Sequence, residues 1–306
     1  MTTSLFFAQL LNGLQLGLLL FLMSAGLTLV LGIMNFVNLA HGSLFMMGAY
    51  FAAVAYGWTD SFLLAALVAV VGTLLLGLLI ERTVLSKLYS RDHLYQVLAT
   101  FGLILFLNEV ARAIWGQAPI FMNVPDALSG TINLFGLPYP SYRFAIIAVG
   151  LLVGLALYLV IHRTRIGMLV RAGASDSSML AALGVNIKLI NALVFGAGAA
   201  LAGLAGLMAG PILSVQPGMG EPILILTLVV LVTGGIGSIR GAFYGALIVG
   251  IVDTIGRAFL PSLLRGVVDR SLAQAAGPAI ASMLIYLVMA VVLAVRPDGL
   301  FPVRHG

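Results

Sequence analysis

Long apolar runs separated by short polar stretches make up almost the whole chain. An α-helix needs about 20 mainly apolar residues to cross a bilayer, and most of these runs approach that length. The runs are Leu5–Leu31, Gly42–Tyr56, Phe62–Ile80, Leu94–Trp115, Phe144–Ile161, Asn191–Gly210, Ile223–Thr233, Gly241–Leu260 and Ala275–Val295. The pattern predicts an all-α, polytopic membrane protein with about 8–9 transmembrane helices, and we treat residues 1–306 as a single membrane domain.

Two of these runs are too short to cross a membrane alone. Gly42–Tyr56 follows a polar interruption, and Ile223–Thr233 precedes the glycine-rich sequence GGIGSIRG. Short runs of this kind can form parts of broken helices. The chain is therefore expected to contain two broken helices.

The two breaks resemble one another, which suggests a pseudo-repeat. VLGIMNFVNLAHGSLFMMGAY and VTGGIGSIRGAFYGALIVG each contain a polar or basic residue directly followed by a glycine and a helix rich in small residues. Paired broken helices indicate a transport pathway between the repeats. The candidate pathway residues are Asn35, Asn38, His41, Gly42, Gly235, Gly237 and Gly241. The alternative is that glycine is simply abundant, with 36 residues, and that Asn35, Asn38 and His41 only cap a broken helix.

Composition agrees with a membrane protein and excludes several other classes. The chain is 61% hydrophobic and 8% charged, compared with roughly 25% charged in soluble domains. The net charge of +5 lies in short clusters between apolar runs and not on one face, so nucleic acid is not an expected partner. There is no cysteine and no paired-histidine motif, so we expect neither a metal site nor a cofactor.

The basic clusters indicate how the chain lies in the membrane. The loop from Arg82 to Arg91, the stretch from Arg163 to Lys188 and the tail from Arg296 to Arg304 are basic, and cytoplasmic loops carry such an excess. The connection from Gly116 to Tyr142 is then outside, as is the N-terminus. This orientation requires an odd number of crossings, about nine if both runs beside GGIGSIRG cross.

Few charged residues interrupt the runs, and most of them can neutralise one another. Glu109 and Arg112 are three residues apart, and Asp253 and Arg257 are four apart, so each pair shares a helix face. We interpret both as structural ion pairs near helix ends. Glu221 is interpreted as a charge that stabilises the N-terminus of its short helix, with a docking point for an outside partner as the alternative.

The residues 163–190 form the longest polar interruption. Ser175 before Asp176 offers helix-capping chemistry, Met179–Leu183 favours a short helix, and Gly184 is placed to stop it. A short capped helix at the cytoplasmic surface suits docking by another protein, although an ordinary basic loop would carry the same charge pattern. No P-loop motif occurs in the chain, so we do not expect it to hydrolyse ATP itself.

Four ordered motifs resemble one known family. They are LLNGLQLGLLLFLMSAGLTLVLGIMNFVNLAHGSLFMMGAY, RAGASDSSMLAALGVNI, FGAGAALAGLAGLMAGP and LVTGGIGSIRGAFYGALIVG. Together these motifs resemble the permease subunits of bacterial ABC importers for branched-chain amino acids, of the LivH type. The resemblance extends over nearly the whole chain.

This resemblance implies a permease of the bacterial inner membrane that works with other subunits. The expected partners are a second homologous permease, two cytoplasmic ATP-binding subunits, a periplasmic substrate-binding protein and membrane lipid. The resemblance also implies that residues 163–190 are the coupling loop to the ATPases. The residues that match its motif are Arg171, Ala172, Asp176, Ala181 and Gly184.

Three alternatives to a branched-chain amino acid importer follow from the sequence. Relatives with the same motifs carry urea or short amides. Repeats and broken helices also occur in stand-alone secondary transporters and channels, which usually keep an unpaired acidic residue at the membrane centre; Glu109 and Asp253 both have an arginine within one turn. An intramembrane enzyme is disfavoured, because no base, nucleophile and oxyanion donor occur at plausible spacing. We therefore expect a transport subunit without catalytic residues.

Overall fold

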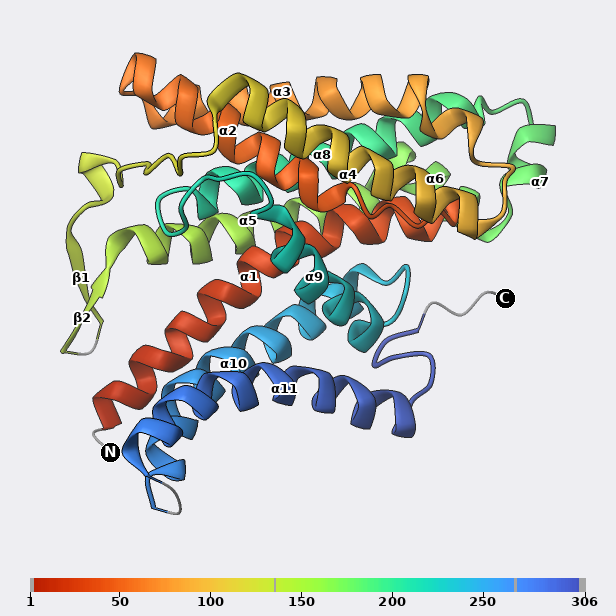
Figure 1. Cartoon of the computed structure of the whole chain (residues 1–306). Helices are drawn as coiled ribbons and strands as arrows, with labels where there is room; N and C mark the ends of the chain where they lie inside the picture. Colours follow the sequence, from red (N-terminus) through yellow and green to blue (C-terminus); the bar gives the residue numbers. More distant parts are fainter. Residues whose placement is uncertain (1–2, 135, 267–268, 303–306) are drawn as a thin grey trace.

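A computed structural model describes residues 3–134, 136–266 and 269–302 as a bundle of α-helices with one β-hairpin (Figure 1). Arg304, at the end of the predicted basic tail, and His305 lie outside these residues. The helices are α1 Thr3–Met34, α2 His41–Thr59, α3 Phe62–Thr83, α4 His93–Trp115, α5 Ser141–Arg163, α6 Arg165–Ser175, α7 Ser177–Ala182, α8 Ile187–Ala209, α9 Gly220–Gly234, α10 Ile239–Leu264 and α11 Arg270–Val295. Two 3₁₀ turns, η1 Leu85–Lys87 and η2 Asp126–Leu128, and the antiparallel strands β1 Thr131–Leu134 and β2 Leu137–Pro140 complete the described fold.

Seven of the described helices are long and apolar enough to cross a membrane. The other two that lie within the bundle are α2, with 19 residues, and α9, with 15. At 1.5 Å per residue α9 is roughly 22 Å long, which is short of the roughly 30 Å hydrocarbon core. The prediction of a polytopic all-α membrane protein is confirmed, and the two short runs are indeed the two helices that begin or end at a break.

Helix α1 occupies the centre of the bundle because it is apolar on all sides. Its middle section, from Leu18 to Val30, is almost completely buried and packs against α5, α8, α9 and α10. The peripheral helices instead expose large apolar side chains, such as Leu63 on α3 and Met283 on α11. A helix that is apolar all round is typical of a buried core, whereas exposed apolar faces in a membrane protein suit contact with lipid.

The two ends of the bundle carry different charge. The N-terminus of α1, the β-hairpin and the α10–α11 connection lie at one end, and α6, α7 and the connection around η1 lie at the other (Figure 1). The second end, which we name the basic end, carries Arg82, Lys87, Arg91, Arg163, Arg165, Arg171, Lys188, Arg240 and Arg296. The first end, the outer end, carries Arg112, Arg143, Arg257, Arg265 and Arg270. The positive-inside rule predicts from this asymmetry that the basic end is cytoplasmic, and the names of the two ends follow this prediction.

Glycines allow the helix backbones to approach closely along two seams. A Cβ atom on Gly17 of α1 would lie 2.9 Å from the Ala246 carbonyl oxygen of α10, and Gly48 of α2 faces Gly203 of α8 backbone to backbone. Small residues at such positions replace the hydrophobic drive that is missing between helices in lipid. The seams hold α1 against α10 and α2 against α8.

Adding a methyl group to such a seam should destabilise the protein. We expect Gly17→Ala to lower the free energy of unfolding by about 1–3 kcal/mol, because the new Cβ overpacks against the α10 backbone. Gly102→Ala on α4 is the matched control: nothing lies within 4 Å of that Cβ position, so the better helix former should be neutral or stabilising by up to about 1 kcal/mol. Thermal unfolding of both variants in detergent measures the difference, and equal shifts would contradict the seam.

Candidate functional site

The first break is a six-residue linker that returns from the basic end into the bundle. Helix α1 ends at Met34, and Asn35 adopts a left-handed conformation with φ 46°. Residues 35–40 then lead back, so that His41, the first residue of α2, lies beside the middle of α1. There the Nε2 atom of His41 is 3.1 Å from the carbonyl oxygen of Met23. Helix α2 therefore begins at the depth of Met23 and not at the membrane surface.

Side chains in this linker mainly satisfy backbone groups. The Oδ1 atom of Asn38 accepts a hydrogen bond from the Ala40 N–H at 3.1 Å, and both Asn38 and His41 are buried. Gly42 packs against α9, where its Cβ would lie 2.6 Å from the Gly220 carbonyl oxygen. The Asn38 contact lies within the linker, and no side chain caps the N-terminus of α2 among the described residues, so the capping role stays a prediction. The buried Nδ2 group of Asn38 has no hydrogen-bond partner among the described residues, so this donor of the linker is unsatisfied.

The second break is a tight turn between two antiparallel helices. Helix α9 ends at Gly234, Gly235 and Gly237 have φ values of 109° and 79°, and the Ser238 hydroxyl accepts a hydrogen bond from the Gly241 N–H at 3.1 Å. Gly241 packs directly on the backbone of Gly234. Glycine readily adopts the positive φ at positions 235 and 237, and its missing side chain permits the contact between Gly234 and Gly241. Together these two needs explain the glycine-rich sequence.

The C-terminal segment packs against the second break, and the sequence did not predict this contact. The backbone N–H groups of Leu300 and Phe301 donate to the carbonyl oxygens of Thr233 and Gly234, at 3.0 and 2.9 Å. The Phe301 ring also stacks on Tyr244 of α10, with centroids 5.1 Å apart. The tail thus supplies hydrogen bonds to the last carbonyls of α9, which a helix end otherwise lacks.

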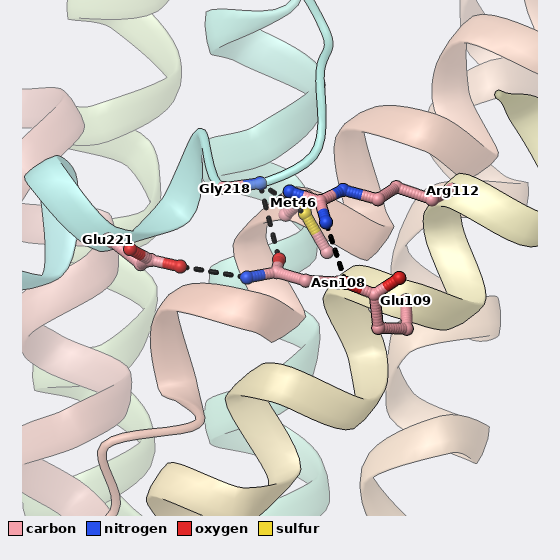
Figure 2. A network of polar contacts seen from close by, with 6 residues as sticks. All are labelled: Met46, Asn108, Glu109, Arg112, Gly218 and Glu221. Atoms are coloured by element: carbon pink, nitrogen blue, oxygen red, sulfur yellow. Dashed lines mark hydrogen bonds and ion pairs between the residues drawn. The ribbon is translucent and has the colours of Figure 1, made fainter. Parts of the chain in front are cut away.

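Polar contacts also fix the loop that enters α9 (Figure 2). Asn108 of α4 donates to Glu221 Oε1 at 2.8 Å and accepts from the Gly218 N–H at 3.2 Å. Glu221 is the second residue of α9, so its charge lies at the helix N-terminus as predicted. The predicted ion pair of Glu109 and Arg112 is present at 2.6 Å.

The second predicted ion pair is also formed. Arg257 Nε lies 2.7 Å from Asp253 Oδ1 on α10, and the Arg257 guanidinium donates to the Ser282 hydroxyl of α11 as well. The two pairs are intrahelical, as their spacing predicted.

The predicted coupling loop consists of two short helices, α6 and α7. Asp176, and not Ser175 as predicted, caps α7: its Oδ1 atom accepts from the backbone N–H groups of Ser178 and Met179 at 3.0 and 2.9 Å. Ser175 is the last residue of α6. Hydrogen bonds from the Ser178 hydroxyl and the Met179 N–H hold the pKa of Asp176 below its usual value, so the cap is ionised at neutral pH.

Glycine ends α7 as expected. Gly184 has φ 85°, and its N–H donates to the Ala181 carbonyl at 3.0 Å, which is the left-handed termination that glycine favours. Ala181 and Gly184 are exposed, and Ala172 is half-buried. Arg171 donates to the Ile161 carbonyl, which ties α6 to the end of α5.

Large apolar side chains are exposed on α6 and α7, although these helices lie beyond the membrane-spanning segments. The side chains are Ile166 and Met168 on α6, Met179 on α7 and Leu183 directly after α7, and Leu183 is 74% exposed. Helix α7 projects from the basic end (Figure 1). Exposed apolar side chains outside the membrane-spanning segments are candidates for contact with another protein.

One cavity at the basic end joins the coupling segment to both breaks. It encloses about 800 Å³ and is lined by residues that include Asn35, Arg171, Asp176, Gly237 and Arg240. Four of the predicted site residues thus come together from positions far apart in the sequence. The others, namely Asn38, His41, Gly42, Ala172, Ala181, Gly184, Gly235 and Gly241, do not line this cavity.

A smaller cavity lies at the outer end, and the sequence analysis missed its residues. It encloses about 300 Å³ between α1, α5, α9 and α10, and its polar lining includes Gln9, Asn12, Gln15 and Arg143. The signal was present in the sequence, since three carboxamides spaced by three residues interrupt one face of an otherwise apolar helix. Only the structure shows that this face of α1 lines a cavity together with Arg143.

Comparisons with known proteins agree on one type of protein. A family model described as branched-chain amino acid transport system / permease component matches residues 9–293. The chain is 34% identical over 260 residues to the high-affinity branched-chain amino acid transport system permease protein BraD of Pseudomonas aeruginosa, covering 80% of this chain and 84% of the relative. It is 31% identical over 263 residues to the permease protein LivH of the corresponding system of Escherichia coli, covering 81% and 85%.

A sugar permease is also similar. The ribose import permease protein RbsC of Escherichia coli is 29% identical over 244 residues, covering 76% of this chain and 72% of the relative. No solved structure matches the chain.

Proposed function

Since this chain belongs to the family of permease components of branched-chain amino acid transport systems, we propose that it is the membrane-spanning subunit of an ABC importer that moves branched-chain amino acids into the cell. It is a multi-pass membrane protein and a transport component, and its proposed location is the bacterial inner membrane. Separate subunits hydrolyse the ATP.

The observation that carries this proposal is the cavity shared by α6, α7 and both breaks. An ATPase that binds the exposed apolar residues of α6 and α7 contacts the wall that contains Arg171 and Asp176. The same cavity is also lined by Asn35 and Gly237, where the backbone is left-handed. Movement of the coupling segment therefore changes the cavity at the two places where the helices are interrupted.

The proposed partners follow from this arrangement and from the family. Two ATP-binding subunits bind at the basic end, one on this chain and one on a second, homologous permease. A periplasmic binding protein delivers the substrate at the outer end. Import then proceeds by alternating access, in which ATP binding and substrate loading each favour one of two states of the permease pair.

Reconstitution of the complete transporter in proteoliposomes tests the function. The expected result is ATP-dependent import of leucine when this chain, the second permease, the ATPase subunits and the binding protein are all present, and none when one of them is omitted. ATP-dependent import of ribose or urea in place of leucine would contradict the proposed substrate. Uptake by the chain alone would identify it as a stand-alone carrier and overturn the proposal.

A further inference from the structure

The outer cavity is lined by two chemically different kinds of side chain. Gln9, Asn12, Gln15 and Arg143 carry amide or guanidinium groups, and Leu19, Ile212 and Ile223 are aliphatic. Its volume of about 300 Å³ lies at the lower end of the range of small-molecule sites, which is about 300–1,000 Å³. This mixed lining suits a small ligand that has both polar groups and an aliphatic part.

Arg143 supplies the charge of the polar lining. Its Nη1 atom donates to Asn12 Oδ1 at 2.6 Å, and the same oxygen accepts from the Tyr139 hydroxyl at 3.2 Å. The Asn12 amide group in turn donates to Gln9 Oε1 at 3.1 Å. These contacts orient the guanidinium, and burial raises the pKa of Tyr139, so that the phenol remains a donor to Asn12.

No carboxylate neutralises this arginine within the described part of the chain, where the ion pairs are those of Arg112 and Arg257. A guanidinium has five N–H donors, and a neutral amide oxygen satisfies only one of them here. Carboxylates are the usual partners of the remaining donors, because they can accept two parallel charge-assisted hydrogen bonds. The cavity thus offers an anion site at the outer end of the bundle.

Gln15 is the second group that points to a ligand. The side chain is 7% exposed and lines the cavity, and no described hydrogen bond involves its amide. The amide is not among the described buried polar atoms that are shut off from solvent without a partner, so it remains available to a ligand in the cavity. Its Oε1 atom can accept from an ammonium group, and its Nε2 amide hydrogens can donate to a carboxylate.

We propose that this cavity is a transient site for a free α-amino acid with an aliphatic side chain, entered from the outer end before the helices open toward the basic end. Arg143 binds the α-carboxylate, Gln15 binds the ammonium or carboxylate group, and Leu19, Ile212 and Ile223 contact the side chain. This inference rests on the proposed amino acid import. A neutral ligand such as urea should bind this cavity weakly, because urea carries no carboxylate for Arg143.

Uptake of radiolabelled leucine by the complete reconstituted transporter tests the site. Arg143→Gln should reduce uptake at least about tenfold, because a charge-assisted hydrogen bond to the carboxylate is lost. Arg143→Lys keeps the charge and should restore a substantial part of the uptake. Arg265→Gln is the matched control, because it removes an exposed arginine at the same end of the bundle, and it should transport like the unaltered chain.

A second readout separates ligand binding from a structural role of the arginine. Arg143→Gln should unfold at nearly the temperature of the unaltered transporter, because the hydrogen bond to Asn12 is only one of the contacts that hold α5 against α1. An equally large loss of uptake in Arg143→Lys and Arg143→Gln, or normal uptake in Arg143→Gln, would overturn the site. If Arg143→Gln does not assemble, Gln15→Leu carries the test, with the same tenfold loss expected and normal uptake contradicting it. Absence of leucine uptake by the unaltered transporter would instead refute the proposed function.

Discussion

Replacing Asp176 with lysine should reduce uptake by the assembled transporter to background, while the amount of chain in the membrane stays unchanged. The carboxylate caps the N-terminus of α7 through two backbone N–H groups, and loss of such a cap destabilises a helix by about 0.5–2 kcal/mol. Lysine also places a positive charge at the positive end of the helix dipole. Because α7 has only six residues, it should unfold and no longer present its apolar side chains to the ATPase.

Asp176→Asn is the matched control for this variant. Asparagine keeps a capping oxygen without the charge, so uptake and ATPase binding should be largely retained. Uptake is measured in proteoliposomes, and ATPase binding by co-purification. Normal uptake in Asp176→Lys would contradict the coupling role of α7, and background uptake in Asp176→Asn would show that the charge and not the cap is needed.

Replacing Gly235 with valine should also abolish uptake, and it should lower the unfolding temperature. Gly235 has φ 109°, which a β-branched residue does not adopt without strain of about 1–3 kcal/mol. Its Cβ would in addition lie 3.0 Å from the Phe301 carbonyl oxygen and 3.1 Å from that of Asp298. The substitution would therefore displace the C-terminal segment from the end of α9.

Gly136→Val is the matched control, because it introduces backbone strain without a contact to the C-terminal segment. Gly136 also has a positive φ of 85°, but nothing lies within 4 Å of its Cβ position in the β-hairpin turn. This variant should lose some stability and keep its uptake. Thermal unfolding and leucine uptake of both variants provide the comparison. Normal uptake in Gly235→Val would show that the second break is not used in transport.

The membrane helices and both breaks could be predicted from the sequence because their determinants are local. Runs of apolar residues set the helices, and Gly235, Gly237 and Asn35 adopt the left-handed backbone that ends them. The same holds for α7, where Asp176 and Gly184 cap the two ends of a short helix. The choice of Ser175 as the cap was wrong by one residue, because Ser175 still continues α6.

The depth of the first break could not be predicted, because it depends on a distant contact. Six residues after α1 could have stayed at the surface, and only the packing of His41 against Met23 places the start of α2 inside the bundle. The same contact explains why Asn38 and His41 lie away from the large cavity. The outer cavity was missed for a similar reason, since Asn12 and Arg143 are separated by 131 residues.

We expect ATPase binding to move α7 relative to the second break. The chain contains no cysteine, so single cysteines at Ala181 and Ile236, both exposed, can carry spin labels without further changes. In the complete transporter, the distance between these labels should change by several ångströms when ATP binds. A pair at Leu63 and Leu79 should keep its spacing of roughly 24 Å, because both residues lie on α3. An unchanged distance between Ala181 and Ile236 throughout the ATP cycle of a transporter that imports leucine would show that α7 does not move relative to the second break.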